Sequence, residues 1–552
     1  MAIEMRAGRE ADEKTLPIYT AFAGGGAKGL VHIGALKALE NKNVAIYGVS
    51  GTSAGAIVAA LKAAGFGADD MVDPKAGTTL LDELARIDPE LRTAPDLFGP
   101  GGWDRVAALR RVLQSGLGTI LGALALASGL LLLLSFLVAA MAGVLYAVLL
   151  WAAWIAVLGL AGRWVVSHLA GLARLERFKQ ALGTLMSRKV FPQEPDRIVR
   201  MKDFGRGGLL PLKIVGSNLS TRRLALFSAE TTPEIPVAEA VAASISIPLV
   251  FEPQKIGRET FVDGGLVSNL PAWPFDEERN LDPDTLTLAF EIADASSDGG
   301  EIGPTNWLPA AIRTALFGSG VLNLRAVGRF ELIELKTELD VLAFDLEKSA
   351  VFEQVADSTT AAELELERRL FERPALYQRA CEAMRAFVEQ LLDTTPVEGR
   401  LGAEKRRVRV SLAMCDEGHS RSLRLRYGAG YGDDLDERLL LPMDGSAMGQ
   451  TWRRGEAYFE TVPLPSAIAL TGRINRFRRK QVWQGMEWVM CIPIFRTDAT
   501  VTEPEFVVSI DGNERPAKSA VESFRTIVEA VAVASFEGLL VDLEKLEKAD
   551  EG

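Results

Sequence analysis

The most reactive side chain suggested by this sequence is the serine in Gly51-Thr52-Ser53-Ala54-Gly55. Residues 44–49 before it form an apolar run typical of a strand, and the small residues 56–61 are typical of a helix. We therefore expect a strand, a sharp turn and a helix, with Ser53 at the turn. The flanking glycines allow a tight turn that leaves the hydroxyl exposed near a helix N-terminus, which suits a nucleophile. A structural glycine-serine turn without a catalytic role gives the same pattern, so this pentapeptide alone does not show whether Ser53 is a nucleophile.

A second glycine-rich segment, Gly24-Gly25-Gly26-Ala27-Lys28-Gly29, follows the apolar run 16–22 and precedes a helical pattern. Consecutive glycines at such a turn leave backbone N–H groups uncovered, and these groups can stabilise a developing oxyanion. A dinucleotide or phosphate loop is the rival interpretation, but neither motif fits, since Lys28 is followed by glycine and the spacing differs. A glycine turn without a ligand stays open.

A candidate base lies downstream in Phe261-Val262-Asp263-Gly264-Gly265. An aspartate at a strand end, followed by two glycines, can approach a serine hydroxyl closely. The chain has three histidines, His32, His168 and His419, and none lies in a context typical of a Ser-His-Asp triad. Sequence alone does not exclude their proximity to Ser53. Direct proton transfer from Ser53 to Asp263 is the simpler assignment.

These motifs, together with Ala243-Ser244-Ile245-Ser246-Ile247-Pro248, resemble the patatin-like phospholipases in order and context. The resemblance covers about residues 15–100 and 190–390. It implies a three-layer α/β/α fold and lipid acyl hydrolysis by a Ser-Asp dyad, with Ser53 as nucleophile and Asp263 as base. The oxyanion hole would then be formed by Gly24, Gly25 and Gly26. The supporting residues that it implies are Lys28, where the family carries Arg or Lys, and Gly51, Gly55, Gly264 and Gly265.

The middle of this domain departs from the family pattern, because no charged residue occurs between Arg111 and Arg163. Residues 117–160 would extend about 60 Å or more as helix, roughly twice the thickness of the hydrocarbon core of a bilayer. We expect two membrane spans in a hairpin that reverses between about Ser135 and Gly143, with a re-entrant insertion as the alternative. Basic residues flank both ends, which predicts that both ends are cytoplasmic. An even number of crossings also keeps both halves of the domain on one side.

The C-terminal region has the pattern α-β-β-α-β-β-α, which predicts an antiparallel sheet with flanking helices. The expected elements are helices at 375–392, 448–453 and 519–546 and strands at 408–413, 422–427, 489–494 and 506–510. Residues 449–456, 491–494 and 508–511 resemble a GAF domain, a family that mostly senses small ligands or dimerises. The basic run 473–480 is either a solvated loop or a contact for anionic headgroups or ligands.

We therefore expect four parts in this α/β protein: a disordered segment (1–14), a patatin-like domain (15–104 and 170–395), a transmembrane hairpin (105–169) and a GAF-like α+β domain (396–552). The net charge of −12 argues against nucleic acid as the main partner. Three scattered cysteines suit a reducing compartment, the charged first 14 residues show no secretory signal, and no metal or organic cofactor is implied.

The predicted function is that of a membrane-anchored lipid acyl hydrolase acting on phospholipid or lysophospholipid. We expect the catalytic and GAF-like domains to lie in the cytoplasm. A small ligand and homodimer formation are expectations for the GAF-like domain. Two other interpretations stay open: a catalytically silent membrane sensor, and an effector that perturbs membranes through its hairpin.

Overall fold

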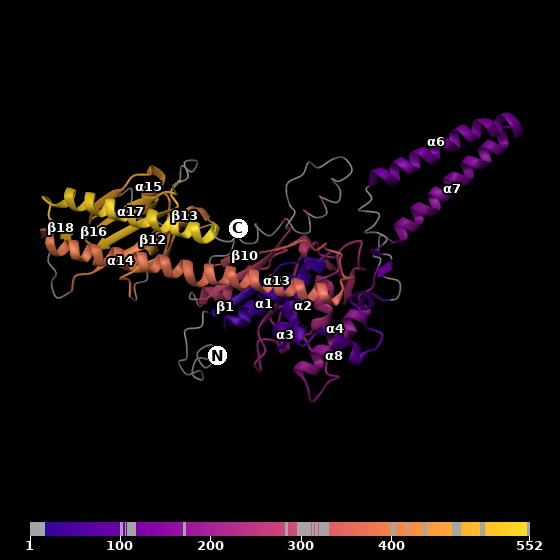
Figure 1. The fold of residues 1–552 in the computed structure, drawn as a ribbon, viewed down its shortest axis with the longest axis horizontal. Coiled ribbons are helices and arrows are strands. Elements are labelled where there is room, and N and C mark those ends of the chain that lie inside the picture. Colours follow the sequence, from indigo (N-terminus) through magenta and orange to yellow (C-terminus); the bar gives the residue numbers. More distant parts are fainter. Residues whose placement is uncertain are drawn as a thin grey trace. The chain divides into compact units, whose positions relative to one another are not determined.

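The computed structural model describes residues 17–99, 103–104, 106–107, 117–168, 173–281, 285–294, 311, 314, 318, 330–398, 405–416, 419–432, 434, 439–465, 476–496 and 503–548. The predicted disordered segment 1–14 and the basic residues Arg105, Arg110 and Arg111 lie outside these residues. The chain divides into two compact units, Met1–Glu365 and Leu366–Gly552 (Figure 1).

The first unit is built on an eight-stranded mixed sheet with the strand order β10-β9-β1-β2-β5-β8-β7, and β6 pairs with β5. Neighbours from β10 to β5 are parallel, whereas β8 is antiparallel to both β5 and β7. The strands are β1 Pro17–Phe22, β2 Ala45–Thr52, β5 Leu212–Asn218, β6 Arg223–Phe227, β7 Gln254–Ile256, β8 Glu259–Asp263, β9 Leu286–Asp294 and β10 Phe330–Thr337. A short separate ladder joins β3 Val72–Asp73 and β4 Thr78–Thr79.

Helices connect these strands. A short helix begins at Gly26, after the end of β1 at Phe22, and another begins at Ala54, after the end of β2 at Thr52. The α-helices are α1 Leu30–Asn41, α2 Ala54–Ala63, α3 Ala68–Met71, α4 Leu80–Ile87, α6 Leu117–Ala142, α7 Val144–His168, α8 Glu176–Val190, α9 Val237–Ser244, α10 Asp276–Leu281 and α13 Lys348–Leu366. The 3-10 helices are η2 Gly26–Gly29, η3 Ala94–Phe98, η4 Met201–Asp203, η5 Gly264–Leu266 and η6 Trp273–Phe275. The carboxyl ends of β1 and β2 therefore hold the glycine loop and Ser53 at the same edge of the sheet.

The charge-free stretch forms two helices, α6 and α7, that pack side by side and meet at Gly143 (Figure 1). Gly143 has a φ of +95°, which a glycine adopts without strain and which ends α6. Many side chains at the ends of both helices are outside the described set, which includes 125–137 and 148–160. None of the helices in the described part of the chain has the length and apolar character that a membrane crossing requires, so the predicted two-span hairpin is not supported.

The second unit contains a six-stranded antiparallel sheet with the order β14-β13-β12-β17-β16-β15. Its strands are β12 Val408–Asp416, β13 His419–Ala429, β14 Leu440–Pro442, β15 Tyr458–Thr461, β16 Trp488–Ile494 and β17 Phe506–Gly512, and β11 Val397–Glu398 pairs with β18 Arg515–Pro516. Its helices are the π-helical η7 Glu367–Glu372, α14 Arg373–Thr394, α15 Ala447–Arg454, α16 Arg476–Gln481 and α17 Val521–Lys548.

Two hydrophobic layers sandwich this second sheet. One face packs against α14 and α17 through residues such as Tyr377, Cys381, Phe524 and Phe536, and the other face packs against α15 around Ala447. Because α14 contributes to this core, it belongs to the second unit, whereas the sequence interpretation placed residues up to 395 in the catalytic domain. The strands β14 and β15 and the helix α16 are elements that the sequence pattern did not predict.

Candidate functional site

Ser53 occupies the turn between β2, which ends at Thr52, and α2, which begins at Ala54. Its backbone has φ 53° and ψ −124°, a conformation that L-residues rarely adopt and that costs free energy to hold. The neighbouring glycines make this turn feasible. A Cβ on Gly51 would lie 2.3 Å from the carbonyl oxygen of Gly55, and a Cβ on Gly55 would lie 2.2 Å from that of Phe22. Both glycines are therefore required by the close approach of β1, β2 and α2.

Asp263 ends β8 and lies within hydrogen-bond distance of Ser53. The Ser53 hydroxyl donates to Asp263 Oδ2 at 2.7 Å, and the Gly265 N–H donates to Asp263 Oδ1 at 2.7 Å. Both side chains are buried, with 4% of Ser53 and 2% of Asp263 exposed. Burial raises the pKa of Asp263 to about 6, although the hydrogen bonds from Ser53 and Gly265 act in the opposite direction. This carboxylate is thus a stronger base than an ordinary aspartate.

Three further serines fix the backbone around this pair. Ser244 Oγ accepts the Ser53 N–H at 2.9 Å and donates to the Val215 carbonyl at 2.6 Å. The Ser246 carbonyl accepts the Asp263 N–H at 2.8 Å, and Ser217 Oγ donates to the Asp263 carbonyl at 2.7 Å. Sequence reasoning gave these serines no role, although two of them lie in the quoted segment 243–248.

The three loop glycines differ in what their N–H groups do. Gly24 donates its N–H to the Asn269 carbonyl at 3.0 Å. In the described part of the chain, the backbone N–H groups of Gly25 and Gly26 donate no hydrogen bond to a residue outside η2. Gly26 has a φ of +58° and lines the same cavity as Ser53. The loop therefore offers the N–H groups of Gly25 and Gly26, whereas that of Gly24 is already engaged.

The remaining predicted residues lie close around this edge of the sheet. Lys28 lies in η2 with its side chain buried. Gly264 and Gly265 open η5 directly after Asp263. A Cβ on Gly264 would lie 2.2 Å from the Val215 carbonyl oxygen, so this position excludes a side chain. The structure thus brings all the predicted residues of the three motifs to one place.

An apolar cavity of about 220 Å³ opens beside Ser53. Apart from Gly26 and Ser53, its lining is apolar: Ala54, Ile57, Leu80, Leu81, Leu84, Ala94, Leu97, Phe98, Phe178, Ala181, Leu182, Leu185, Ile245, Ile247, Phe251 and Phe344. A neighbouring groove of about 640 Å³ shares Gly26, Ala54 and Ile57 with it and has a polar rim that includes Arg92 and Lys348. The site can therefore accommodate a long apolar group next to the serine.

His32 is a structural neighbour of the glycine loop. It is fully buried, its Nε2 lies 2.8 Å from the Ala23 carbonyl oxygen, and its ring packs edge-on against Phe22. Burial lowers its pKa to about 4, so the ring is neutral at pH 7 and donates from Nε2. The side chains of His168 and His419 are outside the described set. Among the described residues, no group of three or more His, Cys, Asp or Glu could hold a metal ion.

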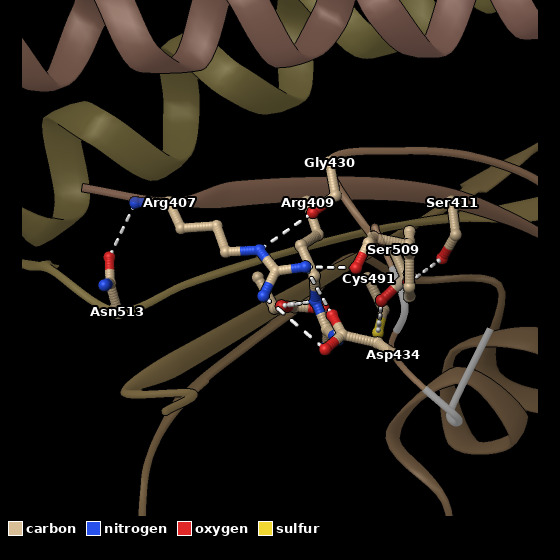
Figure 2. Close-up of polar contacts among 10 residues, drawn as sticks. Arg407, Arg409, Ser411, Gly430, Asp434, Cys491, Ser509 and Asn513 are labelled. Carbon is tan, nitrogen blue, oxygen red and sulfur yellow. Dashed lines mark hydrogen bonds and ion pairs between the residues drawn. The ribbon is translucent and has the colours of Figure 1, made fainter. Parts of the chain in front are cut away.

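The second unit has its own cluster of buried charges around Arg409 (Figure 2). Arg409 Nε and Nη2 donate to the two carboxylate oxygens of Asp511 at 2.7 and 3.1 Å, and Nη1 donates to Asp434 at 3.0 Å. Arg407 also donates to Asp434, at 2.6 Å. Arg409 and Asp511 lie in the wall of a cavity of about 520 Å³, and this cavity is the second candidate site.

Comparison with known families gives one match in the first unit. Residues 20–276 match the family described as patatin-like phospholipase. The uncharacterized protein YqhO of Bacillus subtilis is 29% identical over 281 residues, which are 49% of this chain and 70% of YqhO.

Two solved structures illustrate more distant similarities. VipD from Legionella pneumophila is 17% identical, with a TM-score of 0.27, over 70% of this chain and 78% of VipD. The GAF domain of a phosphoenolpyruvate-protein phosphotransferase from Coxiella burnetii is 16% identical, with a TM-score of 0.22, over 34% of this chain and 95% of that domain. Similarities at these TM-scores carry no conclusion about either unit.

Proposed function

We propose that this chain hydrolyses an acyl ester of a membrane lipid with Ser53 and Asp263, because residues 20–276 match the patatin-like phospholipase family. The observation that carries the proposal is the 2.7 Å hydrogen bond from Ser53 Oγ to Asp263 Oδ2, at the edge of an apolar cavity. A serine hydroxyl needs a base to become nucleophilic, and a carboxylate with a raised pKa meets that need.

The proposed reaction has two steps. In the first, Ser53 Oγ attacks the ester carbonyl carbon while its proton passes to Asp263, and the N–H groups of Gly25 and Gly26 stabilise the oxyanion. Collapse of the tetrahedral intermediate breaks the bond to the alcohol, which leaves with the proton from Asp263. In the second step, Asp263 takes a proton from the water that attacks the acyl carbon. The bond between this carbon and Ser53 Oγ then breaks, Ser53 Oγ takes the proton from Asp263, and a fatty acid is released.

The apolar lining of the cavity supports an acyl chain as the group next to Ser53, and the adjoining groove has room for the rest of a phospholipid or lysophospholipid. Lipid mass spectrometry of bacterial phospholipid vesicles incubated with wild type and Ser53→Ala tests this function. We expect fatty acid and the deacylated lipid to accumulate only with wild type. Equal product with both proteins would contradict the proposal.

We further propose that α6 and α7 insert into the bilayer and hold the site near its substrate, with the rest of the chain in the cytoplasm. The charge-free stretch between Arg111 and Arg163 supports this, as do exposed side chains such as Leu126, Leu133 and Phe136, because water disfavours so large an apolar surface. Replacing 117–160 by a Gly/Ser linker should leave hydrolysis of a water-soluble ester intact and reduce attack on vesicles. Equal rates on vesicles would favour the alternative of a membrane-perturbing effector.

The second unit is proposed as a GAF-like regulatory module that binds a small ligand or dimerises. The cavity beside Arg409 is the observation that favours a ligand. A catalytically silent sensor would need this module and not the Ser53–Asp263 pair, so an inactive wild type in the lipid assay would favour it.

A further inference from the structure

The cavity of the second unit has mostly aliphatic walls. It lies against the sheet face that packs on α15, and α16 contributes to its rim. The apolar side chains in its lining include Leu425, Leu439, Leu441, Met448, Leu464 and Met486. Such walls favour the burial of hydrocarbon by about 25 cal/mol per Å² of apolar surface.

The two aromatic side chains in the cavity are already engaged by guanidinium groups. Arg409 Cζ lies 4.5 Å from the ring centre of Tyr431 and 4.7 Å from that of Trp483. Arg407 Cζ lies 4.9 Å from the Trp483 ring centre, and the Tyr431 hydroxyl donates to Ser411 at 2.9 Å. Because cations occupy these faces, the cavity is poorly suited to stacking a nucleobase or another flat heterocycle.

Among the described residues that line the cavity, positive charges outnumber negative charges. Arg409 is matched by Asp511 and Asp434, as buried charges usually are. Arg479 and Lys480 also line the cavity and have exposed side chains, which places their charges at its opening. Among the described residues, neither of these two cations has an ion-pair partner. The described residues of the opening therefore carry surplus positive charge above an aliphatic interior.

We propose that this cavity binds a single-chain anionic amphiphile, with the alkyl chain against the aliphatic walls and the anionic head at Arg479 and Lys480. Fatty acids and anionic lysophospholipids share this chemistry. Only the source of the ligand rests on the proposed function, since lipid acyl hydrolysis would release both kinds of molecule.

Titration calorimetry of the full chain carrying Ser53→Ala tests the proposal without turnover. Dodecanoate, dodecanol and lysophosphatidylglycerol are compared below their micelle concentrations. Whichever of the two anions binds more tightly shows whether the ligand is a fatty acid or an anionic lysophospholipid. Arg479→Glu with Lys480→Glu should weaken dodecanoate binding at least tenfold and leave dodecanol binding unchanged. Arg454→Glu with Lys518→Glu, an equal charge change at exposed sites outside the lining, should change neither. Equal affinities for dodecanoate and dodecanol in the chain that carries Ser53→Ala alone would overturn the proposal.

A filling variant separates this cavity from other apolar surfaces, α6 and α7 included. Met448→Trp should remove binding of all three probes, whereas Arg454→Trp, on the same helix but outside the lining, should retain it. Binding that survives Met448→Trp unchanged would belong to another surface and would contradict the proposal. Since every sample lacks the Ser53 hydroxyl, failure of the lipid hydrolase assignment would leave these results unaffected.

Discussion

Asp263 and Asp511 are both buried carboxylates, with 2% and 3% of their surface exposed, but their surroundings differ. Asp511 accepts two hydrogen bonds from one edge of the Arg409 guanidinium, Nε and Nη2, so its charge is neutralised in place. In the described part of the chain, Asp263 has no ion pair, and its partners are the Ser53 hydroxyl and the Gly265 N–H. A buried charge with a counter-ion stabilises a geometry, whereas one without a counter-ion keeps a raised pKa and can accept a proton.

The largest effect should be on catalysis, when Asp263 or its partner Ser53 is replaced. Ser53→Ala and Asp263→Asn should each lower the esterase kcat by about 10³-fold or more, because each removes one half of a single proton-transfer unit. The double variant should be no slower than either single variant. Steady-state kinetics on a water-soluble ester measures this. If Asp263→Asn keeps a tenth or more of the wild-type rate, the base lies elsewhere.

Breaking the ion pair between Arg409 and Asp511 should lower the stability of the second unit. Arg409→Met leaves Asp511 buried without its partner and should cost about 3–5 kcal/mol in the free energy of unfolding of the second unit. Arg453→Met removes an exposed pair with Asp444 and should cost about 1 kcal/mol or less. Chemical denaturation followed by circular dichroism gives both values. Similar costs for the two variants would mean that the buried pair is not what holds this region.

The smallest effect is a change of stability with pH, which tests directly whether the pKa of Asp263 is raised. Its pKa is raised from 3.8 to about 6, so the folded state keeps a proton that the unfolded chain releases between these values. The group therefore favours folding below about pH 4, and this contribution is lost as the pH rises to 6. The loss is at most about 3 kcal/mol.

The corresponding measurements compare Asp263→Asn with wild type across this range. The variant should gain stability relative to wild type as the pH rises from 4 to 7, although it is inactive. The wild-type rate should rise through about pH 6 and then level off, since the base must be ionised. A stability difference that does not change with pH would show that the carboxylate is not desolvated as described.

The sequence predicted much of this arrangement because glycine and serine patterns report backbone constraints directly. Strand β2, the turn at Ser53 and α2 follow from the apolar run and the flanking glycines, and four of the six strands of the second sheet follow from strand-like runs in the sequence. Long-range contacts carry no such local signal. The engagement of the Gly24 N–H by Asn269 and the support of Ser53 by Ser244 depend on residues that are distant along the chain.

The cavity of the second unit also depends on long-range contacts that the sequence pattern does not reveal. Arg409 and Asp511 lie on neighbouring strands that pair in register, yet they read as ordinary polar positions in the sequence. Nothing local distinguishes them from the exposed pair of Arg453 and Asp444. The difference is that Arg409 and Asp511 are buried, with Tyr431 and Trp483 packed around the guanidinium.

The position of α6 and α7 within the first unit has a consequence for the order of synthesis. Strand β2, which carries Ser53 at its end, pairs with β5, and the whole hairpin lies between them in the chain. Some 160 residues separate Thr52 from Leu212, so at about 5–20 residues per second β2 would wait on the order of ten seconds or more for its neighbour. During that interval the ribosome presents α6 and α7 before the sheet can close, and an unpaired strand edge is prone to wrong pairing. Chaperone binding to nascent chains should therefore peak between the appearance of β2 and that of β5.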